Sequence, residues 1–161
     1  MSTIRVEPLT ADAFAPFGDV LEARGPSLLI NQGMCHRFHD LARLDFGVDG
    51  RAGISIFQAR PRALPYQFDL VERHPLGSQA FVPMSADPFL VIVAPDRDGR
   101  PGDPRAFLTT GAQGINFLRG TWHGVLTPLA APGLFAVIDR IGPGDNLQEY
   151  RYDVAWTVLP G

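Results

Sequence analysis

Short apolar segments separated by Pro and Gly dominate the chain, which has 15 Pro and 17 Gly. In several segments apolar and polar residues alternate, as expected for a strand with one buried face. The alternation is clearest at residues 54–58 and 68–72. The predicted strands span residues 4–8, 19–22, 27–31, 54–58, 68–72, 79–84, 89–94, 106–109, 114–118, 123–127 and 134–139. We expect the tail, residues 150–158, to add an edge strand or to wrap around a neighbouring molecule.

The expected helix is short and lies near the N-terminus. Thr10 can cap it, Asp12 suits its first turn, and Pro16 and Gly18 end it quickly. Many short strands joined by turns indicate an all-β fold, either a sandwich or a small barrel, and closing the sheet removes its exposed edges. No repeat, linker or composition change divides the chain, so we expect a single domain over residues 1–161.

Composition and charge exclude several classes of partner. The chain has 161 residues, 45% hydrophobic and 19% charged, with a net charge of −3, which is typical of a globular protein. It has no run of basic residues, so we expect no nucleic-acid or membrane binding. One cysteine, Cys35, excludes an intrachain disulfide, and the first residues contain no apolar stretch of signal-peptide length. We therefore expect a cytoplasmic protein.

Four polar residues carry the candidate chemistry. Glu72 and His74 are separated by one residue, so on a strand their side chains point to the same face. Gln79 begins the next predicted strand, and His123 follows a turn that contains glycine. If these side chains converge in one pocket, they can hold a divalent transition metal or form a metal-free acid–base site.

Each of these residues also has a simpler interpretation. A glutamate at a strand end is usually solvated, and a histidine before proline, such as His74, can be an ordinary turn residue. His123 beside Trp122 can be a packed histidine with a satisfied hydrogen bond. Their combined spacing favours the site interpretation, because it matches the pattern of a known barrel.

That pattern resembles the cupin fold. The sequence from Gly120 to His123 reproduces the Gly-x-x-His end of the second cupin motif, with Leu118 at the usual proline position. The first motif usually presents two histidines and a glutamate. Here Glu72-x-His74 takes the place of the histidine pair and Gln79 that of the glutamate. This substitution changes the ligand set and counts against tight iron or manganese binding and redox chemistry.

A closer resemblance is to the ureidoglycolate lyase family, whose signature segment is similar to the stretch from Glu72 to Met84. The resemblance continues at residues 37–41, 108–116, 119–123 and 139–140. It implies a cupin barrel (a double-stranded jelly roll), usually a homodimer, that releases urea and glyoxylate from (S)-ureidoglycolate. That reaction belongs to allantoin breakdown in purine catabolism and nitrogen utilisation. The family is also associated with nickel.

For this reaction the residues suggest two arrangements. His123 or Glu72 would act as the base on the substrate hydroxyl, with His74 as its partner or as the proton donor to urea. If a metal such as Ni²⁺ is bound, the ligands would be His74, Gln79, His123 and Glu72, and Gln79 is also a candidate substrate-binding residue.

Substrate-binding residues are expected in a loop-like segment before the first clear strand. Arg37 and His39 could close over the barrel mouth and clamp the carboxylate. Asn31 and Gln32 could hydrogen-bond to the ureido group. A surface loop or a dimer contact would explain Arg37 and His39 equally well.

Two other functions remain open at this stage. A different metal-dependent cupin enzyme, such as a dioxygenase or a sugar isomerase, should have an occupied metal site with at least two histidine ligands. A non-catalytic cupin would bind a small molecule without turnover. Metal content and an assay of urea release distinguish these functions from the lyase.

Overall fold

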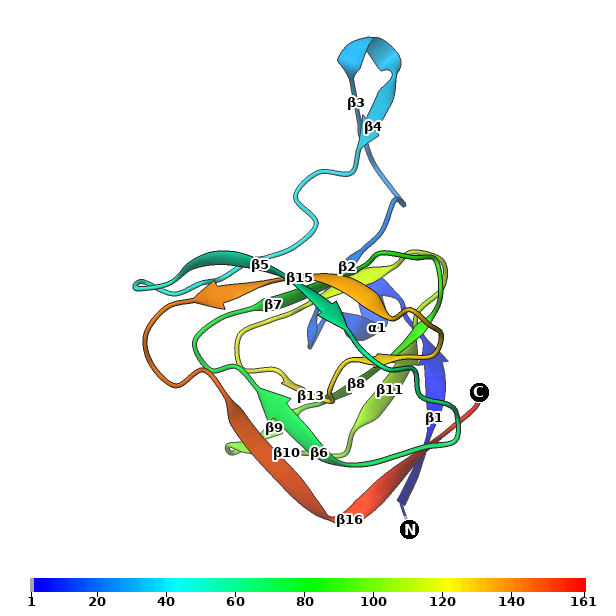
Figure 1. The fold of residues 1–161 in the computed structure, drawn as a ribbon, viewed down its shortest axis with the longest axis vertical. Coiled ribbons are helices and arrows are strands. Elements are labelled where there is room, and N and C mark those ends of the chain that lie inside the picture. Colours follow the sequence, from blue (N-terminus) through cyan, green and yellow to red (C-terminus); the bar gives the residue numbers. More distant parts are fainter. Residues whose placement is uncertain (1) are drawn as a thin grey trace.

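Half of the chain lies in strands in the computed structural model, which describes residues 2–161 (Figure 1). A seven-stranded and a five-stranded sheet make up the body, and two small two-stranded sheets lie outside it. The strands are β1 (Ser2–Pro8), β2 (Gly18–Leu21), β3 (Leu28–Ile30), β4 (Cys35–Arg37), β5 (Arg51–Gln58), β6 (Tyr66–Arg73), β7 (Gln79–Pro83), β8 (Phe89–Ala94), β9 (Asp96–Arg97), β10 (Arg100–Pro101), β11 (Arg105–Leu108), β12 (Gly114–Phe117), β13 (Trp122–His123), β14 (Thr127–Pro128), β15 (Leu134–Ile141) and β16 (Gln148–Leu159).

The short N-terminal helix is confirmed as α1 (Ala11–Phe14). The Thr10 side chain accepts a hydrogen bond from the Ala13 N–H at 3.2 Å, and Asp12 lies in the first turn, as the sequence predicted. Phe14 is fully buried and anchors the helix to the core. In the part of the chain that the structure describes, no helix has the length and apolar character needed to cross a membrane.

The larger sheet closes on itself. Its order is β11-β1-β16-β6-β13-β8-β14, and β8 also pairs with β11, which completes a barrel. The prediction of an edge strand for the tail was wrong, because β16 lies between β1 and β6 and pairs with both. The β1–β16 pairing is parallel and joins segments that are far apart in the sequence, so no local sequence pattern predicts it.

The second sheet, of order β2-β12-β7-β15-β5, packs against the outside of the barrel. Strand β8 shows how the two layers share one element. Val91 and Val93 contribute to a cluster with phenylalanines of the second sheet, whereas Leu90 and Ile92 point to a cluster inside the barrel. The all-β prediction is therefore confirmed, and the closed barrel is consistent with a cupin-type barrel. We call the cluster that contains Val91 and Val93, between the barrel and the second sheet, the interlayer core.

A hairpin arm of β3 and β4 projects from the body (Figure 1). Leu29 and Met34 on this arm are 60% and 86% exposed, which is unusual for large apolar side chains. At its tip Asn31 and Gln32 both have positive φ, of 54° and 56°. Two consecutive left-handed residues other than glycine are strained, which marks the tip as a candidate contact element.

Candidate active site

Glu72, His74 and His123 come together in the structure. One ligand atom from each, a carboxylate oxygen or an imidazole nitrogen, lies within 4.8 Å of the other two. The strand register explains the approach, because Glu72 on β6 is directly opposite His123 on β13. Gly120, with φ of +76°, turns the chain before β13, and its N–H donates to the His74 carbonyl at 2.9 Å. The two sequence motifs are thus joined by backbone contacts, and we call these three side chains the Glu–His–His cluster.

The cluster lies at the margin of the interlayer core. His123 pairs with Val93, an interlayer core residue, whereas the preceding Trp122 belongs to the cluster inside the barrel. The His123 ring stacks on Phe117 of β12, with centroids 4.2 Å apart and an interplanar angle of 5°. His123 is 2% exposed, while Glu72 and His74 are only partly buried. Solvent or a ligand therefore reaches the cluster from the side of Glu72 and His74.

Both imidazoles are held with the Nε2 lone pair free. His74 Nδ1 is 2.7 Å from the Asn146 carbonyl oxygen, and His123 Nδ1 is 2.9 Å from that of Gly124. A carbonyl oxygen only accepts hydrogen bonds, so each Nδ1 carries a hydrogen, and Nε2 is the ring nitrogen that can present a lone pair. The same arrangement orients histidines that bind metals.

Buried acceptor atoms without a partner coincide with the predicted site. Within residues 2–161, four buried side-chain atoms have no hydrogen-bond partner: His74 Nε2, Gln79 Oε1, Asn116 Oδ1 and His123 Nε2. Buried polar atoms are normally satisfied, so such atoms call for a specific explanation. Three of the four belong to residues that the sequence predicted for the site, and each of these three presents a lone pair. The arrangement suits a ligand that brings hydrogen-bond donors or a cation.

Burial also sets the proton affinities. Desolvation lowers the pKa of His123 to about 3, with a further contribution from His74 and an opposing one from the Gly124 carbonyl. Desolvation raises the pKa of Glu72 above 4.5; His74 partly opposes this, and Glu149, which pairs with Glu72 across β16 and β6, adds to it. His123 is therefore neutral at physiological pH, and the Glu72 carboxylate is a stronger base than a solvated glutamate.

The protein is expected to lose stability in mild acid through His123. In the unfolded chain this imidazole takes up a proton near pH 6.5, whereas in the fold it does so only at about 3. The unfolded state therefore binds more protons between these limits, and stability falls as pH decreases, by about 2 kcal/mol from pH 7 to pH 5. Denaturant unfolding of the metal-free protein at both pH values measures this. An equally steep loss in His123→Asn would contradict the assignment.

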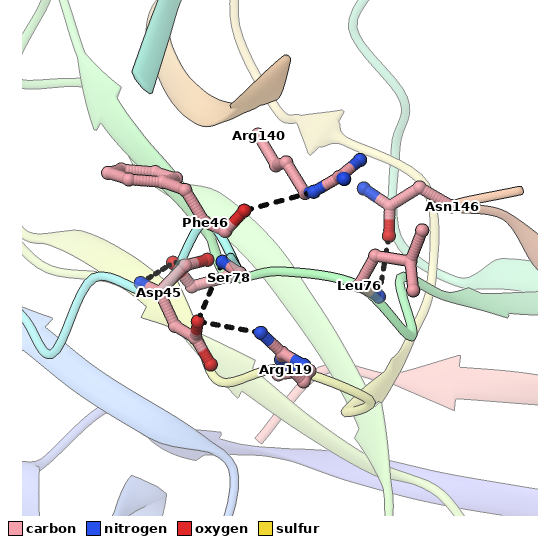
Figure 2. A network of polar contacts seen from close by, with 8 residues as sticks. Asp45, Phe46, Leu76, Ser78, Arg119, Arg140 and Asn146 are labelled. Carbon is pink, nitrogen blue, oxygen red and sulfur yellow. Dashed lines mark hydrogen bonds and ion pairs between the residues drawn. The ribbon is translucent and has the colours of Figure 1, made fainter. Parts of the chain in front are cut away.

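A polar network anchors the turn that follows β6 (Figure 2). Leu76 N–H donates to Asn146 Oδ1 at 2.8 Å, and the N–H of Asp45 donates to Ser78 Oγ at 2.7 Å. Arg119 pairs with the Asp45 carboxylate at 2.7 Å, and Arg140 Nε donates to the Phe46 carbonyl at 2.9 Å. Segments distant in sequence thus fix the turn between His74 and Gln79.

Asn146 makes two hydrogen bonds with this turn. Its backbone carbonyl accepts from His74 Nδ1, and its side-chain oxygen accepts from the Leu76 N–H. Asn146→Ala leaves the partly buried Leu76 N–H without its acceptor, at an expected cost of about 1 kcal/mol in unfolding free energy. We also expect lower turnover, because the position of His74 is less well fixed. Asn146→Asp retains an acceptor oxygen and is the matched control. Equal stability of the alanine and aspartate variants would argue against the role of this bond.

The other predicted substrate-binding residues lie on or beside the hairpin arm. Arg37 and His39 border a hollow of about 260 Å³ together with Pro26, Ser27 and Leu28, and Asn31 is exposed at the tip. No hydrogen bond or ion pair among residues 2–161 joins Arg37, His39 or Asn31 to the Glu–His–His cluster. Their substrate-binding roles stay predictions.

Two neighbours of the site were not predicted as site residues. Asp139 on β15 is the register partner of Gln79 and accepts a hydrogen bond from Gln79 Nε2 at 3.1 Å. Asn146 approaches from a loop 72 residues beyond His74 in the sequence. The contact of Asp139 with Gln79 depends on the register of β15 against β7, which the local sequence does not reveal.

Comparison with known proteins finds one family that matches nearly the whole chain. A family model described as ureidoglycolate lyase matches residues 1–159. A Rhodobacter capsulatus protein named ureidoglycolate lyase is 64% identical over 155 residues, covering 96% of each chain. One from Chelativorans sp. with the same name is 55% identical over 154 residues, covering 94% of this chain and 93% of its own. Ureidoglycolate lyase 1 of Rhizobium meliloti is 49% identical over 158 residues, covering 96% and 92%.

Proposed function

Because the chain belongs to the ureidoglycolate lyase family, we propose that it cleaves (S)-ureidoglycolate to glyoxylate and urea at the Glu–His–His cluster. The observation that carries the location is the set of buried acceptor atoms without partners at His74, Gln79 and His123. A substrate with one hydroxyl and several N–H groups supplies the donors that these atoms lack. The enzyme is a carbon–nitrogen lyase.

The substrate is a hemiaminal, in which one carbon bears a hydroxyl, a urea nitrogen and a carboxylate. A base removes the hydroxyl proton, the C–O bond becomes the carbonyl of glyoxylate, and the C–N bond breaks as urea takes up a proton. Glu72 is the better base of the two predicted candidates, because burial raises its pKa and lowers that of His123. Once protonated, Glu72 can return the proton to the departing urea nitrogen, which balances the reaction.

The donor set also fits a divalent metal. Two imidazoles whose Nε2 atoms have no hydrogen-bond partner among residues 2–161, together with a carboxylate, match the ligands that Ni²⁺ and similar ions prefer. Glu72, His74 and His123 would hold the ion, whereas Gln79, which the sequence also offered as a ligand, is left free to bind the substrate. A bound ion would lower the pKa of the substrate hydroxyl. The protein side chains would still bind the substrate and move its proton.

Turnover of racemic ureidoglycolate tests the proposal directly. We expect urea and glyoxylate in equal amounts, from one enantiomer. Release of ammonia and carbon dioxide in place of urea would reject the lyase reaction. Absence of turnover with and without added Ni²⁺ or Mn²⁺ would identify a binding protein instead.

We further propose that the enzyme acts as a homodimer in the cytoplasm, in allantoin degradation. Support for the dimer comes from apolar side chains on the outer face of the second sheet, where Ile54 is 75% and Ile56 58% exposed. The hairpin arm adds a second uncovered apolar surface, and a two-fold dimer can cover one with the other. Sedimentation of the wild type and of Ile54→Glu tests this, and a monomeric wild type would refute it.

A further inference from the structure

The amide of Gln79 has a fixed orientation. Gln79 is 6% exposed, and its Nε2 donates to Asp139 Oδ2 at 3.1 Å. A carboxylate offers only lone pairs, so the amide nitrogen must face Asp139 and the oxygen must face away. Oε1 is left buried and without a partner among residues 2–161. Asp139 thus makes Gln79 an acceptor toward the site.

This acceptor lies on the opposite layer from the Glu–His–His cluster. Gln79 is two residues before Phe81 of the interlayer core, so both side chains are on the inner face of β7. Its partner on β12 is Phe117, whose ring stacks on His123. Gln79 and His123 are therefore both neighbours of Phe117, one from each layer.

We propose that Gln79 Oε1 and the Asp139 carboxylate form the subsite that binds the N–H groups of the ureido half of the substrate. This inference rests on the proposed function and adds a recognition role for both residues. A ureido group carries N–H donors on both nitrogens, and the pair offers an amide acceptor beside a carboxylate with spare lone pairs. The negative charge of Asp139 disfavours the substrate carboxylate at this position, so it also sets the direction in which the substrate binds.

In this arrangement Gln79 is bound to substrate and not to a metal. The subsite holds the ureido group as it leaves, while Glu72 takes the proton from the hydroxyl on the reacting carbon and returns it to the departing nitrogen. Asp139 acts on the substrate directly and through the orientation of Gln79. Loss of either residue should affect ureido recognition and leave binding of other carboxylates unchanged.

Two unreactive probes of nearly the same shape separate these effects. N-carbamoylglycine has a carboxylate and a ureido group but no hydroxyl, and 4-oxopentanoate replaces both ureido nitrogens by carbon. We expect the wild-type protein to bind N-carbamoylglycine more tightly by about tenfold, because one or two hydrogen bonds are at stake. Isothermal calorimetry with the full-length protein measures both dissociation constants.

The variants Asp139→Asn and Gln79→Met should reduce this preference to about twofold or less, with little change for 4-oxopentanoate. Asparagine has the same shape as aspartate but can donate to Gln79, so it no longer fixes the amide. Methionine removes the acceptor and keeps the volume. Ni²⁺ affinity should be unchanged in Gln79→Met.

Three results would overturn the inference. These are equal binding of both probes by the wild type, equal weakening of both probes in the variants, and loss of Ni²⁺ affinity in Gln79→Met. The proposed function fails separately: a protein that prefers N-carbamoylglycine but releases no urea from ureidoglycolate retains the subsite and loses the lyase assignment.

Discussion

Glu72→Gln is expected to lower kcat/KM for ureidoglycolate cleavage by about 10²–10⁴-fold, the usual contribution of a general base. Glutamine keeps the size of the side chain and most of its packing, but it cannot accept the hydroxyl proton. The loss should appear mainly in kcat, since the substrate contacts at Gln79 and Asp139 are untouched. Steady-state kinetics with coupled detection of glyoxylate measure the effect, and metal content is determined in parallel.

Glu149→Gln is the matched control for Glu72. It removes the same charge from the residue directly opposite on β16, but Glu149 is exposed and contributes no atom to the Glu–His–His cluster. We expect activity near that of the wild type. Wild-type activity should fall on the acid side as Glu72 becomes protonated, at a pH above 4.5, and this limb should move to lower pH in Glu149→Gln because Glu149 helps to raise the pKa of Glu72. An acid limb that does not move, or a Glu72→Gln enzyme with normal kcat, would remove Glu72 as the base.

His123→Gln should produce the second large effect, a loss of about 100-fold or more in kcat/KM. His123 presents a buried Nε2 that has no hydrogen-bond partner within the described part of the chain, residues 2–161, and its ring is fixed by Phe117 and by the Gly124 carbonyl. Glutamine can place a lone pair nearby, but its flexible chain does not hold that lone pair at the position of Nε2. Kinetics and Ni²⁺ titration of the same preparation measure the two consequences.

His36→Gln supplies the comparison for a histidine outside the site. His36 lies on the exposed hairpin arm and contacts Ser27. We expect its turnover to match the wild type. Full activity in His123→Gln would exclude His123 from the reaction.

Much of the fold could be predicted because it follows from local patterns. The alternation at residues 68–72 and the apolar run at residues 89–94 correspond to β6 and β8, and Thr10 caps α1 as expected. Barrel closure could not be predicted, because the parallel pairing of β1 with β16 joins segments at opposite ends of the chain. The same limitation led to the wrong edge position for the tail.

The candidate site, like the fold, could be predicted only in part from the sequence. Glu72, His74 and His123 were found through their motifs, and the structure brings these three together. Asp139 was missed because its contact with Gln79 depends on the register of β15 against β7. Asn146 lies in an irregular loop, and its carbonyl bond to His74 leaves no sequence signal. Residues that act through register or through backbone atoms require the three-dimensional structure.

Closure of the barrel by β16 has a consequence for protein synthesis. Strand β6, which ends next to the Glu–His–His cluster, obtains one of its two neighbours from residues 148–159. Those residues leave the ribosome about 75 residues after the end of β6, so the nascent chain carries β6 with an open edge until then. Glu72 therefore reaches its final surroundings only after translation has passed β16, and a nascent chain stalled before this strand should be inactive.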